Sequence, residues 1–119
     1  MLIAYWIVAG LLAVLYVYSG GMKVVRSKEA LRPMMGWVDD IPFGAVRLIG
    51  VVEVLGAIGL VVPPLVGIMP WLAVAAAVGL VLVQVGAAVV HLRRGETVWM
   101  NAVLAVLAGV AVWLATVWL

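Results

Sequence analysis

Cysteine is absent from this chain of 119 residues, and histidine occurs once, as His91. Without cysteine the chain cannot carry out thiol redox chemistry, hold an iron–sulfur cluster or form a disulfide. A single histidine cannot supply the two imidazoles of a bis-histidine haem, and with one deep carboxylate it falls short of the three protein ligands of a catalytic zinc site. We therefore predict no metal and no cofactor, except that a quinone or another lipophilic ligand could be bound.

Charged residues are also scarce, at 10% of the chain, whereas 69% is hydrophobic. A soluble domain is usually about a quarter charged and about half apolar. The mean hydropathy of +1.36 points the same way, so the composition excludes a soluble globule, a disordered tail and a coiled coil. The net charge of +2 is too small to indicate nucleic acid. We expect the lipid bilayer as partner, together with membrane or redox proteins or further copies of the chain.

The uncharged runs divide into stretches that are long enough to cross a bilayer at about 20 residues per helix. The first run, residues 1–22, lacks the basic start and the cleavage site of a signal peptide, so we expect it to remain as a helix. The long run after Glu53 is interrupted by residues that are expected to end a helix: Pro63, Pro64, Gly67 and Pro70. The sequence therefore predicts an all-α fold, a four-transmembrane-helix bundle in one domain over residues 1–119, with helices at about 2–22, 43–62, 71–92 and 97–119.

The basic residues predict the orientation of this bundle. All seven lie in or beside the first and third loops: Lys23, Arg26, Lys28, Arg32, Arg47, Arg93 and Arg94. The positive-inside rule then places these two loops in the cytoplasm and both termini outside, in a multi-pass protein of the cell membrane. Within the first loop, Ser27 is expected to cap a short turn. The apolar residues that follow predict a segment along the membrane interface: Met34, Met35, Trp37 and Val38.

Glu53 is the only acidic residue that lies away from a loop. A carboxylate in hydrocarbon must be paired, be protonated or contact water. At 1.5 Å of rise per residue, Glu53 lies about 9 Å deeper in the membrane than Arg47. We hypothesise that it carries a proton, acts as a general acid or base, or holds a ligand. The alternative is a structural role, in an ion pair with Lys23 or Arg47 or in a hydrogen bond with Gln84.

Further polar residues share helix faces near the same end of the bundle. The first helix carries Leu12, Tyr16, Ser19 and Lys23 at the spacing of a single face. Connectivity brings this face close to those of the other helices. The sequence thus predicts one ligand-binding pocket at the cytoplasmic end, lined by Tyr16, Ser19, Lys23, Arg47, Glu53, Gln84, His91 and Asn101. The structural alternatives are contact with lipid headgroups for the basic groups and hydrogen bonds between helices for the others.

Several motifs together resemble the DoxX-like family. They are SGGMKVV at 19–25, PFGAVRLIGVVEVLGAIGL at 42–60, and HLRRG at 91–95 with Asn101 shortly after. The resemblance covers nearly the whole chain and implies a small four-helix membrane protein. Some relatives are membrane subunits of thiosulfate–quinone oxidoreductases, and others are linked to oxidative-stress assemblies. It thus implies a quinone-side or scaffolding subunit, and the lack of cysteine argues against covalent handling of sulfur.

Three functions follow from these observations as hypotheses. The first is a non-enzymatic subunit or scaffold of a redox, oxidative-stress or quinone-linked membrane assembly, whose pocket at Glu53 receives a lipophilic molecule. The second is a proton-coupled transporter of the small multidrug resistance type, although that family carries its essential glutamate in the first helix. The third is a small membrane enzyme that uses Glu53 and His91 as an acid/base pair.

Overall fold

The computed structural model describes residues 2–31, 33, 36 and 41–119. Its long helices are α1 (Leu2–Val25), α3 (Phe43–Val66), α4 (Leu72–Arg93) and α5 (Trp99–Ala115), the last continued by the 3-10 turn η2 (Thr116–Trp118). The structure contains four candidate membrane spans by length and composition, and no strand occurs in the part of the chain that it describes. The predicted all-α, four-helix fold is confirmed.

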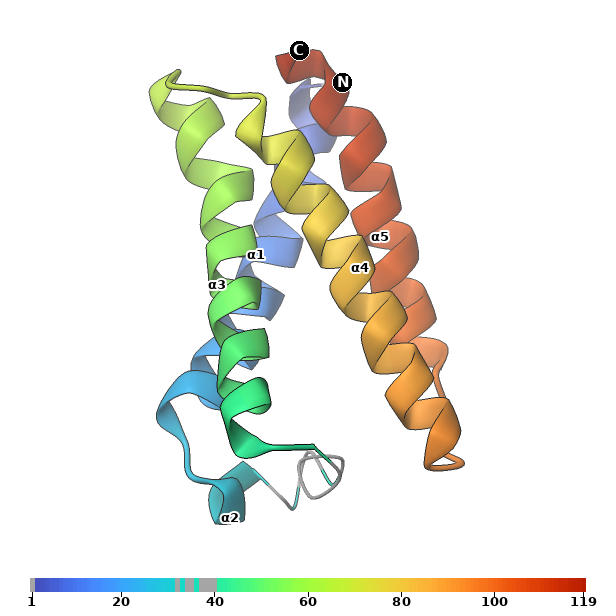
Figure 1. The fold of residues 1–119 in the computed structure, drawn as a ribbon. Helices are drawn as coiled ribbons and strands as arrows, with labels where there is room; N and C mark the ends of the chain where they lie inside the picture. Colours follow the sequence, from blue (N-terminus) through green and yellow to red (C-terminus); the bar gives the residue numbers. More distant parts are fainter. Residues whose placement is uncertain (1, 32, 34–35, 37–40) are drawn as a thin grey trace.

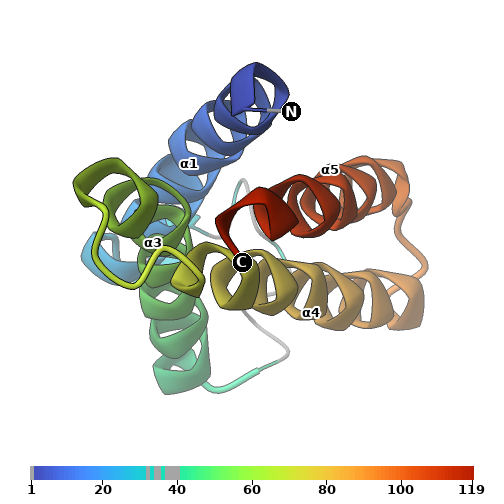
Figure 2. The same cartoon turned by 90° about the horizontal axis from the view of Figure 1, so that it is seen from above.

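The two ends of the bundle differ in what they carry (Figure 1). Both chain termini lie at one end, which we call the terminal end. The short helix α2 (Lys28–Leu31) and the α4–α5 loop lie at the opposite end, which we call the basic end. Helix α1 packs mainly against α3, and α4 packs mainly against α5. These two pairs are close together at the terminal end and diverge toward the basic end, as Figure 1 shows, while Figure 2 looks along the bundle.

Two prolines lie inside α3, and the expectation that they end this helix is wrong. The helix continues through Pro63 and Pro64 to Val66 and ends at Gly67, whose positive φ of 73° closes it with a left-handed turn. Pro64 has no N–H to donate to the carbonyl of Leu60, four residues earlier. The hydroxyl of Tyr5 in α1 donates a hydrogen bond to that carbonyl instead. A partner helix therefore satisfies a backbone group that the proline leaves open, which allows the helix to continue.

The first loop follows the prediction only in part. Helix α1 extends to Val25, so Lys23 lies in the helix and not after it. Ser27 does cap the following turn, because its side-chain oxygen accepts a hydrogen bond of 3.2 Å from the Ala30 N–H at the start of α2. The proposed interfacial segment falls on residues outside those described: Met34, Met35, Trp37 and Val38.

Small residues make up much of the apolar core. Ala9, Ala73, Ala77, Ala108 and Ala111 are completely buried between the helices. Lipid-facing helices gain little from the hydrophobic effect when they associate, so they depend on close packing, which small side chains allow. At the terminal end, the rings of Tyr5, Trp6 and Trp118 pack edge to face with centroids 5.3 to 5.9 Å apart. This packing closes the terminal end.

Candidate functional site

The close approach of α1 and α3 determines the position of the deepest charged residues. A β-carbon on Gly20 would lie only 2.6 Å from the Gly50 carbonyl oxygen, and one on Gly50 would lie 2.7 Å from the Gly20 oxygen. Only glycine permits the two backbones to meet in this way. One turn beyond this contact, Lys23 of α1 and Glu53 of α3 face each other.

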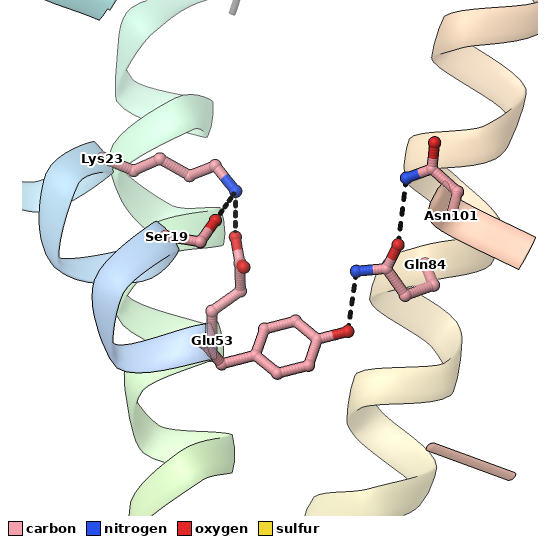
Figure 3. Close-up of polar contacts among 6 residues, drawn as sticks. Ser19, Lys23, Glu53, Gln84 and Asn101 are labelled. Carbon is pink, nitrogen blue, oxygen red and sulfur yellow. Dashed lines mark hydrogen bonds and ion pairs between the residues drawn. The ribbon is translucent and has the colours of Figure 1, made fainter. Parts of the chain in front are cut away.

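Lys23 and Glu53 form a buried ion pair (Figure 3). The Lys23 ammonium contacts Glu53 Oε1 and also donates a hydrogen bond of 3.0 Å to Ser19 Oγ. Lys23 is 8% exposed and Glu53 is 2% exposed. The structure thus selects Lys23 among the partners that the sequence left open for Glu53, and the paired charges offset part of the cost of removing each from water.

A second polar group lies across from this ion pair and joins three helices (Figure 3). Gln84 of α4 donates from Nε2 to the Tyr16 hydroxyl of α1 at 2.7 Å, and its Oε1 accepts a bond of 3.0 Å from Asn101 of α5. Gln84 is buried, at 5% exposure. Because an amide can both donate and accept, Gln84 is hydrogen-bonded through both its nitrogen and its oxygen.

A cavity of about 660 Å³ lies between the two polar groups. It is bordered by seven of the eight residues that the sequence predicted: Tyr16, Ser19, Lys23, Glu53, Gln84, His91 and Asn101. The rest of the lining is almost entirely apolar, and includes Leu82 and Met100. These two side chains are 66% and 48% exposed. The cavity is therefore lined in part by apolar side chains that are not buried in the core.

Arg47 is the predicted site residue that does not border this cavity. Its guanidinium donates to the Arg26 carbonyl at 3.4 Å and lies over the Phe43 ring, 4.8 Å from its centre. Arg47 precedes Glu53 by six residues, which places the two about 120° apart around the helix axis. This spacing could have separated Arg47 from the pocket on sequence alone.

His91 borders the cavity at the basic end and contacts an acid that the sequence reasoning missed. Its Nδ1 lies 2.9 Å from Glu96 Oε1, which also accepts a bond of 3.0 Å from Arg94 Nε. The hydrogen bond with His91 lowers the pKa of Glu96 below its ordinary value, with a further contribution from Arg94. Gly95, with a positive φ of 72°, turns the chain between them. An acid directly after the HLRRG motif was the signal available in the sequence.

In residues 2–31, 33, 36 and 41–119, no three side chains of the histidine, cysteine, aspartate or glutamate type come together as a metal site would require. The chemistry available at the cavity is instead that of an amine, a carboxylate, hydroxyls and amides, beside an imidazole.

The model of the DoxX-like family matches residues 7–115. The matched range contains every predicted site residue, from Tyr16 to Asn101. Neither the curated proteins nor the solved structures contain a match to the chain.

Proposed function

Since this chain belongs to the DoxX-like family, we propose that it is a non-enzymatic membrane subunit or scaffold of a redox, oxidative-stress or quinone-linked assembly, and that its cavity binds a lipophilic ligand. The observation that carries this proposal is the cavity of about 660 Å³ beside the Lys23–Glu53 ion pair. Small-molecule sites usually have volumes of roughly 300 to 1,000 Å³, with mostly apolar walls and a few polar groups that orient the ligand.

The lining of the cavity favours a ligand that is dissolved in the bilayer. Leu82 and Met100 form part of the lining and are well exposed. Such an apolar lining suits an apolar tail, whereas a strongly hydrated ligand would have to lose its water to enter. A molecule with a long apolar tail and a small polar head fits this lining.

The polar groups favour a head that accepts hydrogen bonds. The Lys23–Glu53 pair is neutral as a unit, so the cavity does not require a charged head. The Tyr16 hydroxyl accepts from Gln84, and its own hydrogen has no acceptor among the residues described. A hydroxyl can donate once and accept twice, so Tyr16 is available to donate to a carbonyl oxygen. The carbonyl of a quinone has this chemistry.

The packing at the terminal end favours a binding site over a transport path. Between Tyr16 and the terminal end, the inward positions are occupied by completely buried side chains, among them Tyr5, Leu12 and Leu60. A transporter of the small multidrug resistance type needs a route to both sides of the membrane, whereas this cavity opens at one half of the bundle.

The proposed orientation places the basic end in the cytoplasm. The helix ends Lys23 to Arg26 and Arg93 to Arg94 lie away from both termini (Figure 1), and cytoplasmic loops carry an excess of lysine and arginine. Reporter fusions at Leu119 and within the loop at Arg94 test this orientation. A cytoplasmic signal from Leu119 would reverse it and move the cavity to the other leaflet.

Ligand binding is tested with the full chain in lipid nanodiscs and a ubiquinone analogue as probe. Tyr16→Phe should weaken binding about tenfold, since one net hydrogen bond is worth about 1 to 1.5 kcal/mol. Tyr18→Phe is the matched control, because Tyr18 is 64% exposed on the same helix, and it should bind as the unchanged chain does. Equal affinity in all three proteins, or no binding to any, would contradict the proposal. Molecules that co-purify in mild detergent would identify the natural ligand.

A further inference from the structure

Lys23 combines the features of a reactive amine. Lys23 borders the mainly apolar cavity and is only 8% exposed. Its Nζ contacts Glu53 Oε1 and lies 3.0 Å from Ser19 Oγ. In hydrocarbon, an ammonium and a carboxylate in contact can exchange a proton and become two neutral groups, which removes both charges from a medium that solvates them poorly. The neutral amine is the nucleophilic form of lysine.

The cavity limits which electrophiles can reach this amine. Its lining is mainly apolar and includes Leu82 and Met100, which are well exposed. Carbonyl compounds with long apolar tails dissolve in the bilayer and suit this lining, whereas small hydrated reagents must leave water first. An apolar wall also keeps water scarce, and scarce water slows the hydrolysis of an imine.

We propose that Lys23 captures long-chain aldehydes from the bilayer as a Schiff base, with Glu53 as its proton partner and counter-ion. This inference rests on the proposed function, because it assigns a reactive class of ligand to the same cavity. It goes beyond reversible binding in that a covalent bond forms at a named atom.

The reaction balances without an oxidant or a reductant. Glu53 first takes one proton from the Lys23 ammonium, and the free amine adds to the aldehyde carbon to give a carbinolamine. Glu53 then returns a proton to the carbinolamine hydroxyl, which leaves as water while the C=N bond forms. The net change is one ammonium and one aldehyde to one iminium and one water. The iminium carries the positive charge that Lys23 had, and the Glu53 carboxylate remains its counter-ion.

The geometry separates the two roles. Glu53 is the acid–base group because its Oε1 contacts the reacting nitrogen. Ser19 is a positioning residue, since its hydroxyl accepts a hydrogen bond from Nζ and the residue also borders the cavity. The chain contains one other lysine, Lys28 in the short helix α2, which provides an internal comparison.

The experiment uses the full chain in nanodiscs with hexadecanal as probe and cyanoborohydride to reduce the iminium to a stable amine. Intact-mass measurement should show one added alkyl group, and peptide mapping should place it on Lys23. Lys28→Arg should leave this labelling unchanged. Lys23→Arg keeps a cation beside Glu53 but cannot form the imine, so it should abolish the labelling. Glu53→Gln should slow it at least tenfold.

Labelling that is absent, that falls on Lys28 alone, or that persists undiminished in Glu53→Gln would overturn the proposal. Thermal unfolding of each variant shows whether a loss of labelling comes from a loss of fold. If Glu53→Gln unfolds, Lys23→Arg still tests the proposal, because it keeps a cation beside Glu53 and removes only the amine that forms the imine. Binding of the ubiquinone analogue is measured in parallel. Quinone binding without an adduct overturns only this inference, whereas a Lys23 adduct without quinone binding supports it and contradicts the quinone ligand.

Discussion

The terminal half and the basic half of this bundle are built from the same four helices but solve different packing problems. In the terminal half the inward positions are mostly alanine and leucine, with the aromatic cluster of Tyr5, Trp6 and Trp118 at its end. In the basic half the inward positions include Lys23 and Glu53, and a cavity separates the helix pairs. The comparison teaches that small side chains bring all the helices together in the terminal half, whereas in the basic half polar side chains border a space between the two helix pairs.

The largest expected effect tests the ion pair that defines the basic half. Lys23→Met leaves the Glu53 carboxylate buried without its cation, and breaking a buried pair in this way costs about 3 to 5 kcal/mol. Adding Glu53→Gln should recover most of this loss, because the unpaired charge is gone. Thermal unfolding in mild detergent measures both variants. If Lys23→Met alone is as stable as the unchanged chain, the ion pair does not stabilise the fold.

The next effect tests the contact in the basic half at which the backbones of α1 and α3 meet. Gly20→Ala places a β-carbon 2.6 Å from the Gly50 oxygen, and forcing α1 and α3 apart should cost about 1 to 3 kcal/mol. Gly21→Ala is the matched control, since its β-carbon meets nothing within 4 Å. If both variants unfold at the same temperature, the contact does not hold the helix pair together.

A smaller effect tests the Leu60 carbonyl in the terminal half, which Pro64 leaves without an N–H donor. Tyr5→Phe removes the hydrogen bond to the Leu60 carbonyl and should cost about 1 kcal/mol. In a Pro64→Ala background the helix supplies its own N–H to that carbonyl, so the same change should cost much less. The unfolding free energies of the unchanged chain, the two single variants and the double variant give the coupling energy between Tyr5 and Pro64. Tyr18→Phe, at a side chain 64% exposed, is the control and should have no effect.

The smallest effect concerns Glu96, at the mouth of the basic half. Its pKa is lowered below the ordinary value of 4.5, first by the hydrogen bond with His91. The contact therefore stabilises the fold above pH 4.5 and is lost as the pH falls through the lowered value. The unfolding temperature of the chain minus that of Glu96→Gln should decline as the pH falls from 4.5 through the lowered pKa of Glu96. The group is exposed, so the difference is small; a difference that grows in acid would contradict the assignment.

Much of the site was accessible from sequence because helical spacing carries the information. The spacing of Tyr16, Ser19 and Lys23 predicts one face of α1, and these residues do border the cavity. The family resemblance was likewise confirmed over residues 7–115. Arg47 was misplaced because its depth was considered without its angle around the helix. That these residues bind a ligand stays a prediction.

Other features were beyond the sequence because they depend on contacts between helices. Proline normally ends a helix, and the Leu60 carbonyl that Pro64 leaves open within α3 is satisfied by the Tyr5 hydroxyl from another helix. The contact of Glu96 with His91 similarly depends on the turn at Gly95.

The sequence by itself determined that this protein lies in a membrane as four helices, because an apolar excess and the positions of charge need no knowledge of contacts. It also determined which face of each helix is polar. Only the tertiary structure decided that Glu53 pairs with Lys23, that Gln84 joins Tyr16 to Asn101, and that a cavity lies between them. The physical reason is that helical periodicity specifies a side chain's direction from its own axis. The partner it meets depends on how closely two axes approach, here at Gly20 and Gly50.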